Sequence, residues 1–451
     1  MCARLLKSFW DGEKICQSES AVSFSLRDAE EENGLLCVYP QERFQAIRGF
    51  GCALTESAGY VLEQMPEAAR AEVIDACYGP DGLNYNLARL CIDSCDFSLN
   101  NYSAIEQPCT ERLEGFSLER DGRYVIPLLR RVQSAAPGEV GVMMAPWSPP
   151  AFMKTNGERN HGGKLRAEYW GVWAKYICRY ICEYRALGVD VRLLSPQNEP
   201  KAVQTWDSCI FTAEEEARFI HDYLYPELER AGLAGIVEII GWDHNKERCY
   251  EWARKLFDGD TAAMVKGIGL HWYSGDHFDA VRFIRDRYPE KRLILTEACI
   301  EYRSYAYDDV LRNALKYGHE MIGGFNCGVD TFFDWNLTLD KDGGPNHAGN
   351  LCESPIMCDT EAGTYRKMPS YAYIGHMSRY FLPGARVLGV SSYTRDLEAA
   401  ACARADGSIA LTMLNLADEA LAFKIRLNGK MAGVELPAKG IATCVVEVGE
   451  A

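Results

Sequence analysis

Two glutamates, Glu199 and Glu297, follow apolar runs in the segments "VRLLSPQNEP" and "RLILTEAC". Hydrolysis of a glycosidic bond needs two carboxyl groups, one to protonate the leaving oxygen and one to attack or activate water. A single Glu at the end of such a run is more often a surface or ion-paired residue, whereas two of them are more informative. These residues therefore favour the hydrolysis of a sugar linkage.

Other polar and aromatic residues stand at the ends of similar runs. They are Asp96, Trp147, Asn198, His271, Tyr273, Trp335 and Asn336. In a parallel α/β barrel the carboxyl ends of all strands meet on one face, where the active site is built. Core packing alone does not predict this placement, so we expect these side chains to share a pocket with the two glutamates.

Eight apolar runs between residues 45 and 381 alternate with amphipathic segments, which is typical of strands and helices around a parallel sheet or barrel. The runs are "QAIRGFGCAL", "YNLARLCID", "EVGVMMAPW", "VRLLSPQNEP", "GIVEIIGWD", "KGIGLHWY", "RLILTEAC" and "CGVDTFFDWNL". This number indicates an α/β fold with a closed (β/α)8 TIM barrel. The fourth and seventh strands face one another in such a barrel, so Glu199 and Glu297 can converge.

One helix is expected before the fourth strand. Its apolar residues recur at helical spacing, and Gly188 is a natural residue at which to end it. The apolar positions are Trp170, Trp173, Ile177, Tyr180, Ile181 and Tyr184. Helical spacing alone explains these aromatic residues, so we interpret them as core.

After Phe381 the pattern changes to short β-rich runs without a long helix, and the first 40 residues look similar in "AVSFSLR" and "LLCVYP". We predict a small β-sandwich built from both chain ends. The expected domains are residues 1–44 for its N-terminal strands, 45–381 for the barrel and 382–451 for the rest of the β-sandwich.

The composition excludes several classes of protein. A formal charge of −16 disfavours nucleic acid as a partner. No run approaches the roughly 20 apolar residues of a membrane span. The 18 cysteines include no Cys-x-x-Cys pair, and the first residues have no apolar signal-like core. We therefore expect reduced, structural thiols and a cytoplasmic location, although a secreted mature form stays open.

Several segments resemble glycoside hydrolase family 30, which includes glucosylceramidase and related β-glycosidases. The similar stretches begin at Gly49, Ala88, Ala145, Gln197, His271, Thr296 and Trp335, and they read "GFGCALTESA", "ARLCIDSCDFSLNNY", "APWSPPAFMKTNG", "QNEP", "HWY", "TEAC" and "WNLTLDKDGGPN". They occur in the family's order. Two departures are Glu56, where the family usually has Asp, and Ser195-Pro196, where a β-branched pair is commoner.

The resemblance implies a retaining β-glycosidase that cleaves β-linked glucosides, with Glu199 as acid/base and Glu297 as nucleophile. It implies that Asn198 holds the sugar 2-hydroxyl and that Arg89, His271 and Tyr273 support the nucleophile and its neighbours. It also implies a glucose subsite, and the residues lining it are Asp96, Trp147, Trp335 and Asn346. The substrate is expected to be a small, oligosaccharide or glycolipid β-glucoside, with no cofactor and no metal.

Retention carries two further expectations. The nucleophile must reach the anomeric carbon without an intervening water, so the carboxyl groups should lie about 5 to 5.5 Å apart. Glu199 should stay protonated near neutral pH, with a pKa raised by the negative charge of Glu297, while Arg89 and Tyr273 keep Glu297 ionised.

Alternatives remain at this stage. A β-1,6-glucanase, β-xylosidase or β-fucosidase would use the same pair of carboxylates. A non-catalytic carbohydrate-binding protein is disfavoured because both glutamates are present. A metal-dependent hydrolase would need a His and Asp ligand set, and the eight histidines show no such spacing. Trp147, Trp335, His271 and Arg89 each also have a purely structural interpretation, and Cys299 is expected to serve packing. The aglycone, exo or endo action and the oligomeric state stay open.

Overall fold

The computed structural model describes residues 1–27, 32–302 and 309–447. The chain divides into two compact units. One comprises Met1–Gly49, Tyr305–Thr331 and Lys367–Ala451, and the other comprises Phe50–Ser304 and Phe332–Arg366. The domain limits expected from the sequence, near residues 44 and 381, stay a prediction.

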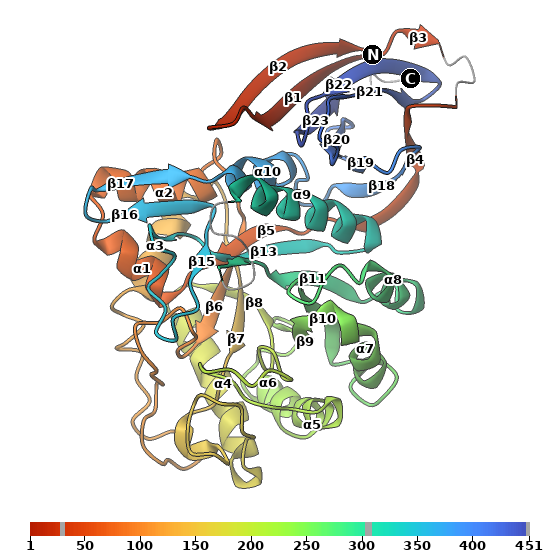
Figure 1. Cartoon of the computed structure of the whole chain (residues 1–451). Helices are drawn as coiled ribbons and strands as arrows, with labels where there is room; N and C mark the ends of the chain where they lie inside the picture. Colours follow the sequence, from red (N-terminus) through yellow and green to blue (C-terminus); the bar gives the residue numbers. More distant parts are fainter. Residues whose placement is uncertain (28–31, 303–308, 448–451) are drawn as a thin grey trace. The chain divides into compact units, whose positions relative to one another are not determined.

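Eight parallel strands close into a barrel, as predicted (Figure 1). They are β5 (Gly49–Ala53), β6 (Leu87–Ile92), β7 (Gly141–Pro146), β8 (Asp190–Leu194), β9 (Glu238–Asn245), β10 (Val265–His271), β11 (Arg292–Glu297) and β13 (Thr331–Asn336). Six apolar side chains from six of these strands form a buried layer inside the barrel. They are Leu87, Met143, Leu193, Ile240, Ile294 and Phe333.

The first barrel strand is shorter than expected, because Gln45 and Ala46 belong to a different sheet. They end strand β4 (Leu35–Ala46), and Ala46 pairs with Arg386 there. Gly49, the first residue of β5, has φ 142°, a conformation that glycine adopts far more readily than other residues. A change of sheet within one apolar run leaves no mark on hydrophobic periodicity.

The helices between β5 and β11 are α1 (Glu56–Glu63), α2 (Glu67–Tyr78), α3 (Val125–Ala135), α4 (Trp170–Ala186), α5 (Ala213–Phe219), α6 (Tyr225–Arg230), α7 (Cys249–Phe257) and α8 (Phe278–Arg287). A π-helical turn, Ile220–Leu224, joins α5 to α6. Short 3-10 turns lie at Ala151–Met153, Ala167–Tyr169 and Lys246–Arg248. Each covering helix buries one apolar face, which is the amphipathic pattern that the sequence shows.

Helix α4 buries five of the six residues predicted for its stripe, Trp170 being half-buried, and ends before Gly188, which has φ 78°. Two tyrosines of this stripe, and the neighbouring Tyr176, also use their hydroxyl groups. Asp121 accepts hydrogen bonds from Tyr180 and from Tyr184 at 2.6 Å, and Asp93 accepts from Tyr176 at 2.6 Å. The stripe is therefore core, as expected, and it also anchors the loop that follows β6.

Two small sheets in the loops beyond β11 and β13 were not expected. Strand β12 (Ile300–Glu301) pairs with β15 (Cys352–Glu353), and β14 (Leu339–Asp340), β16 (Ile356–Asp359) and β17 (Thr364–Lys367) form the other. The strands are too short to show a period of two. Both sheets fix loops at the carboxyl ends of barrel strands.

The other unit contains a ten-stranded sheet to which both chain ends contribute (Figure 1). Its strands are β1 (Cys2–Trp10), β2 (Ile15–Ser23), β3 (Leu26–Arg27), β4, β18 (Arg386–Ser392), β19 (Leu397–Ala403), β20 (Ile409–Asn415), β21 (Leu421–Leu427), β22 (Lys430–Leu436) and β23 (Ile441–Val446). Strand β4 lies between β18 and β21, and β1 pairs with β23. Side chains along the whole sheet share one apolar core, which gives the predicted β-sandwich. Strands β1 and β22 were missed by the sequence patterns.

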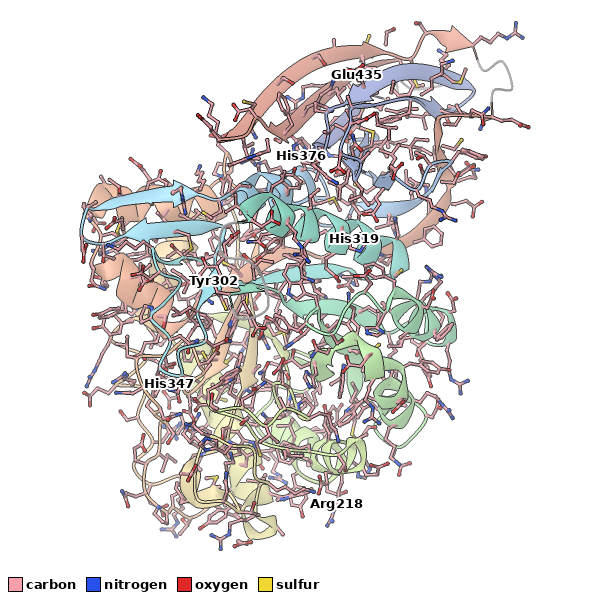
Figure 2. All side chains as sticks on the ribbon, in the orientation of Figure 1. Arg218, Tyr302, His319, His347, His376 and Glu435 are labelled. Carbon is pink, nitrogen blue, oxygen red and sulfur yellow. The ribbon has the colours of Figure 1, made fainter. Side chains whose placement is uncertain are left out.

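Helices α9 (Val310–Cys327) and α10 (Pro369–Ser378) pack against each other in this unit. His376 of α10, labelled in Figure 2, is buried against the sheet. Its ring nitrogens lie 2.9 Å from Ser8 Oγ and 2.9 Å from Thr443 Oγ1. One imidazole thereby connects α10 to β1 and to β23.

In the described part of the chain, no helix combines the length and apolar character needed to cross a membrane. All 18 cysteines have free thiols, and 13 of them are buried. Burial raises the pKa of several, including Cys178, whose pKa rises to about 12.

Candidate active site

The loop that carries Glu199 is fixed by backbone hydrogen bonds to both neighbouring strands. It follows β8, and the N–H of Asn198 donates to Pro146 O of β7 at 2.8 Å. The N–H of Glu199 donates to Asp243 O of β9 at 2.9 Å. Glu199 itself has φ 47°, a left-handed conformation that costs energy for a residue with a side chain. Such strain is typical of a side chain that is held in place for a function.

Two irregularities in the barrel pairing aim the next side chains. Between β9 and β10 the register skips from Gly241 to His244, and Trp242 and Asp243 have φ 70° and 50°. Between β10 and β11 a second shift brings Glu297 opposite His271. Bulges redirect side chains and are frequent beside active sites. Here they turn Asp243, His244 and Glu297 toward the same place.

One imidazole lies between the two glutamates. His271 Nδ1 is 3.0 Å from Glu199 Oε1 and 3.9 Å from Glu297 Oε1. Its other nitrogen, Nε2, is 3.2 Å from Asp243 Oδ1. The structure therefore brings Glu199 and Glu297 together, although 98 positions separate them in the sequence.

Glu297 accepts hydrogen bonds on both carboxyl oxygens. Arg89 Nη1 donates to Oε2 at 2.5 Å, and Tyr273 OH donates to Oε1 at 2.9 Å. The same guanidinium donates through Nη2 to Asn198 Oδ1 at 2.9 Å and to Asp243 Oδ2 at 3.0 Å. Arg89 is fully buried, so it orients three acceptors from inside the barrel.

The two tryptophans lie against each other. The rings of Trp147 and Trp335 stack at 5.1 Å with an interplanar angle of 17°. Arg89 Cζ lies 4.8 Å from the centroid of the first ring and 5.4 Å from that of the second. Both rings line the cavity at the site, so they form one continuous aromatic wall.

Asp96 and Asn346 form a pair at the same cavity. Asn346 Nδ2 donates to Asp96 Oδ2 at 3.1 Å, and Asn346 Oδ1 accepts from the N–H groups of Ala348 and Asn350. Burial, together with the negative charge of Glu297, raises the pKa of Asp96. His347, labelled in Figure 2, donates its backbone N–H to Asp96 O at 3.1 Å.

Seven of the ten site residues expected from the sequence line a cavity of about 130 Å³. They are Asp96, Trp147, Asn198, Glu199, Tyr273, Glu297 and Trp335. The other three support this lining: Arg89 and His271 contact the glutamates, and Asn346 contacts Asp96.

Sequence reasoning missed further lining residues. They are Gln204, Trp206, His244, Asn245, Glu301 and Asn350. His244 and Asn245 end the fifth barrel strand, so their position could have identified them. Gln204 and Trp206 lie in the loop after β8, where no periodicity marks a residue. Cys299 also lines the cavity, with Sγ 3.4 Å from Cys352 Sγ.

The expectation of a raised pKa for Glu199 is wrong. Burial would raise it, but the interactions of Glu199 with His244 and His271 outweigh burial and lower the pKa. Burial would also lower the pKa of His271, yet the charge of Glu297 and its contacts with Asp243 and Glu199 raise it to about 9. Two histidines beside one carboxyl group could not be inferred from sequence spacing.

Three side chains at the site could hold a metal ion. Among the residues that the structure describes, Glu199, His244 and His271 present ligand atoms that all lie within 4.8 Å of one another. They come from three different strand ends, which is why no motif in the sequence showed them as a set.

Comparison with known proteins agrees with this fold. Residues 47–381 match the glycosyl hydrolase family 30 TIM-barrel domain, and residues 384–444 match the beta sandwich domain of that family. SrfJ from Salmonella typhimurium is 38% identical, with a TM-score of 0.94 over 99% of this chain and 100% of that one.

Two further relatives have informative names. The Caenorhabditis elegans protein named putative glucosylceramidase 4 is 30% identical over 86% of this chain and 78% of its own length. The endo-β1,6-glucanase BT3312 is 25% identical, with a TM-score of 0.87 over 98% of each chain. With a barrel and a β-sandwich that both match its domains, the chain belongs to glycoside hydrolase family 30 and is a glycoside hydrolase.

Proposed function

We propose that the protein is a retaining β-glycosidase for β-linked glucosides, with Glu297 as nucleophile and Glu199 as acid/base. The observation that carries this proposal is the shared contact of both carboxylates with His271 Nδ1, at 3.0 and 3.9 Å. A double displacement forms a glycosyl-enzyme on one carboxylate, and water then releases the sugar with help from the other.

The same contact limits the distance between the two carboxylates. Because both Oε1 atoms lie close to one nitrogen, they are at most about 7 Å apart, whereas inverting enzymes span about 6.5 to 9.5 Å. Almost all carboxylate separations below this limit are too short for a water molecule to lie between the carboxylate and the sugar. This supports direct attack and hence retention.

Each glutamate has surroundings suited to its proposed role. Glu297 is held by donors on both oxygens, which matches an acceptor-only carboxylate ready to attack. Glu199 and His271 share a hydrogen bond, and the raised pKa of His271 keeps a proton in this pair near neutral pH. We propose that the pair supplies the proton to the leaving oxygen.

The cavity supports binding of a single sugar ring. Its volume of about 130 Å³ is well below the roughly 300 Å³ at which pockets for drug-sized ligands begin. The wall of Trp147 and Trp335 offers an aromatic face, while Asp96 and Asn198 offer polar partners for hydroxyl groups. We propose glucose for this ring, in keeping with a relative named as a putative glucosylceramidase.

A second candidate activity is the hydrolysis of β-1,6-glucan. Gln204, Asn245, Glu301 and Asn350 add polar atoms to the cavity lining, and Asn350 Nδ2 donates to Glu301 Oε1 at 3.1 Å. Polar groups favour a sugar over a lipid chain as the leaving group, because buried polar groups without partners are costly. A solved relative is titled an endo-β1,6-glucanase.

A substrate panel separates these candidates. Nitrophenyl β-glucoside, β-xyloside, β-fucoside and β-galactoside identify the sugar, and glucosylceramide and β-1,6-glucan then identify the leaving group. We expect the β-glucoside to have the highest kcat/KM of the four. A faster β-xyloside or β-fucoside would contradict glucose as the preferred sugar.

The substitution Glu297→Gln tests the nucleophile. A neutral amide cannot form the glycosyl-enzyme, so kcat should fall by more than about a thousandfold. Thermal unfolding should show that the variant is folded. Activity above about one part in a thousand, after contamination is excluded, would argue against Glu297.

The substitution Glu199→Ala tests the acid/base. Poor leaving groups need protonation and activated aryl groups do not, so the variant should lose far more rate on the former. Added azide should restore turnover and yield a β-glycosyl azide. An α-glycosyl azide, or equal loss on both substrates, would reject the assignment.

A further inference from the structure

Glu199, His244 and His271 form a cluster of three side chains that can each ligate a metal ion. The proposed reaction gives no role to His244. Glu199 Oε1 lies 3.0 Å from His271 Nδ1 and 3.5 Å from His244 Nδ1. His244 is about nine-tenths buried, and its Nδ1 has no hydrogen-bond partner among the described residues. His244 also lines the cavity, and its buried Nδ1 lies beside Glu199 Oε1.

The spacing of the three ligand atoms suits a small divalent cation. Zinc binds imidazole nitrogen and carboxylate oxygen at about 2.0 to 2.2 Å, which places neighbouring ligand atoms of a tetrahedral site about 3.3 to 3.5 Å apart. The distance from Glu199 Oε1 to His244 Nδ1, 3.5 Å, agrees with that spacing, and the distance to His271 Nδ1, 3.0 Å, is slightly shorter. All three ligand atoms lie within 4.8 Å of one another, and a water molecule would complete a tetrahedral site.

The residue behind the cluster strengthens this interpretation. A metal-binding histidine usually directs its second ring nitrogen to a carboxylate, which fixes the ring and its tautomer. Asp243 Oδ1 lies 3.2 Å from His271 Nε2, and Asp243 Oδ2 accepts a hydrogen bond from Arg89 at 3.0 Å. His271 Nδ1 is thus the nitrogen that remains available to an ion.

We propose that Glu199, His244 and His271 form a binding site for a divalent transition-metal ion such as Zn²⁺ or Co²⁺, and that the bound ion inhibits the enzyme reversibly. Two imidazoles and one carboxylate are ligands that these ions accept. A carboxylate that ligates the ion cannot pass a proton to the leaving oxygen. The inhibition rests on the proposed role of Glu199, whereas the binding does not.

Direct binding of Co²⁺ to the full chain tests the site without any assay of turnover. Absorption titration should show one ion with nitrogen and oxygen ligands, and thermal unfolding should move to higher temperature with the ion. His244→Asn and Glu199→Gln should each weaken binding at least about tenfold. His244→Gln is a second form of the first variant, and melting without metal shows that each variant is folded.

His277→Asn is the matched control, because His277 is exposed and has φ 39°, which Asn tolerates. It should bind Co²⁺ as tightly as the unchanged chain. Cys2 and Cys16 are not buried, and ligation by thiolate would be visible as an intense charge-transfer band. Such a band for the tightest ion, or equal affinity in all variants, would overturn the site.

Inhibition is measured separately with Zn²⁺ on the unchanged enzyme and on His277→Asn. Both should lose activity with the same concentration dependence, and a chelator should restore it. Co²⁺ binding at the cluster without inhibition by Zn²⁺ would overturn the inhibitory role. If no glycoside is hydrolysed at all, the proposed function fails, while the binding measurements still decide the metal site.

Discussion

Arg89 is the residue on which the charges of the site depend. It is buried without exposure to solvent, and it contacts the carboxylates of Asp243 and Glu297 at 3.0 and 2.5 Å. Burying two carboxylates in a barrel is unfavourable unless a cation and several hydrogen bonds compensate them. Arg89 also donates a hydrogen bond to Asn198. The ammonium group of a lysine, a point charge on a flexible chain, would therefore not replace the planar guanidinium.

We expect Arg89→Met to lower the free energy of unfolding by about 3 to 5 kcal/mol, because it leaves buried charges without a partner. Arg89→Lys should lose less, since it keeps the charge. Chemical denaturation measures both. Arg254→Met is the control, because Arg254 is exposed and its ion pair with Asp258 should contribute less than about 1 kcal/mol. Equal losses for Arg89→Met and Arg254→Met would contradict the argument.

For single residues, the sequence predicts the placement of side chains at strand ends better than the placement of side chains that are redirected by a β-bulge. Glu199, Glu297 and Trp335 follow apolar runs, and their placement in one cavity was expected. Asp243 and His244 also end a strand, but a register shift aims them, and such shifts leave no periodic signal. For the same reason the lowered pKa of Glu199 was not predicted, since it depends on His244.

Helix α10 shows how one side chain can make an element sensitive to pH. Both ring nitrogens of His376 are engaged by hydroxyl groups at 2.9 Å. Burial, with a smaller contribution from the charge of Arg379, lowers the pKa of His376 to about 3. The ordinary value is about 6.5, so the folded protein favours the neutral ring and the unfolded chain binds a proton first.

The stabilisation from neutral His376 is therefore present above pH 6.5 and is lost as the pH falls from 6.5 toward 3. Each pH unit in that window should cost up to about 1.4 kcal/mol. We expect His376→Gln to remove this part of the slope in a plot of unfolding free energy against pH. Parallel curves for the two proteins between pH 6 and pH 4 would show that His376 does not act in this way.

Elements with a clear period were predictable, and short or irregular ones were not. The stripe of α4 and all eight barrel strands were recognised from hydrophobic spacing. Strand β22 was missed because Gly433 interrupts its pattern, and β12 and β15 have two residues each. Whether such a short segment forms a strand depends on its pairing partner and on side-chain hydrogen bonds, and the local sequence shows neither.

For the whole molecule, the most consequential feature is the sheet built from both chain ends. Strand β4 lies in its interior, between β18 and β21, and β1 pairs with β23. Apolar residues of β1 and β4 belong to the same core as those of the last strands. Removing the first strands would expose that core and leave ladder groups of the neighbouring strands unpaired.

A chain that lacks residues 1–46 should therefore aggregate or unfold at a much lower temperature, although it retains the whole match to the family's barrel domain. Solubility and thermal unfolding measure this. A peptide of residues 1–46 added during refolding should restore part of the folded protein. A shortened chain that melts like the full one would show that the last strands form a stable sheet alone.

The same sheet cannot be completed during synthesis until the last strands of the chain have been made, because β4 pairs with β18 and β21 and β1 pairs with β23. About 340 residues separate the end of β4 from the start of β18. At a synthesis rate of about 5 to 20 residues per second, the first strands wait on the order of 20 to 70 s for their neighbours. During that time their edges are open to pairing with other chains. The charged half of β4, with Glu42 and Arg43, is the kind of sequence that discourages such pairing while translation continues.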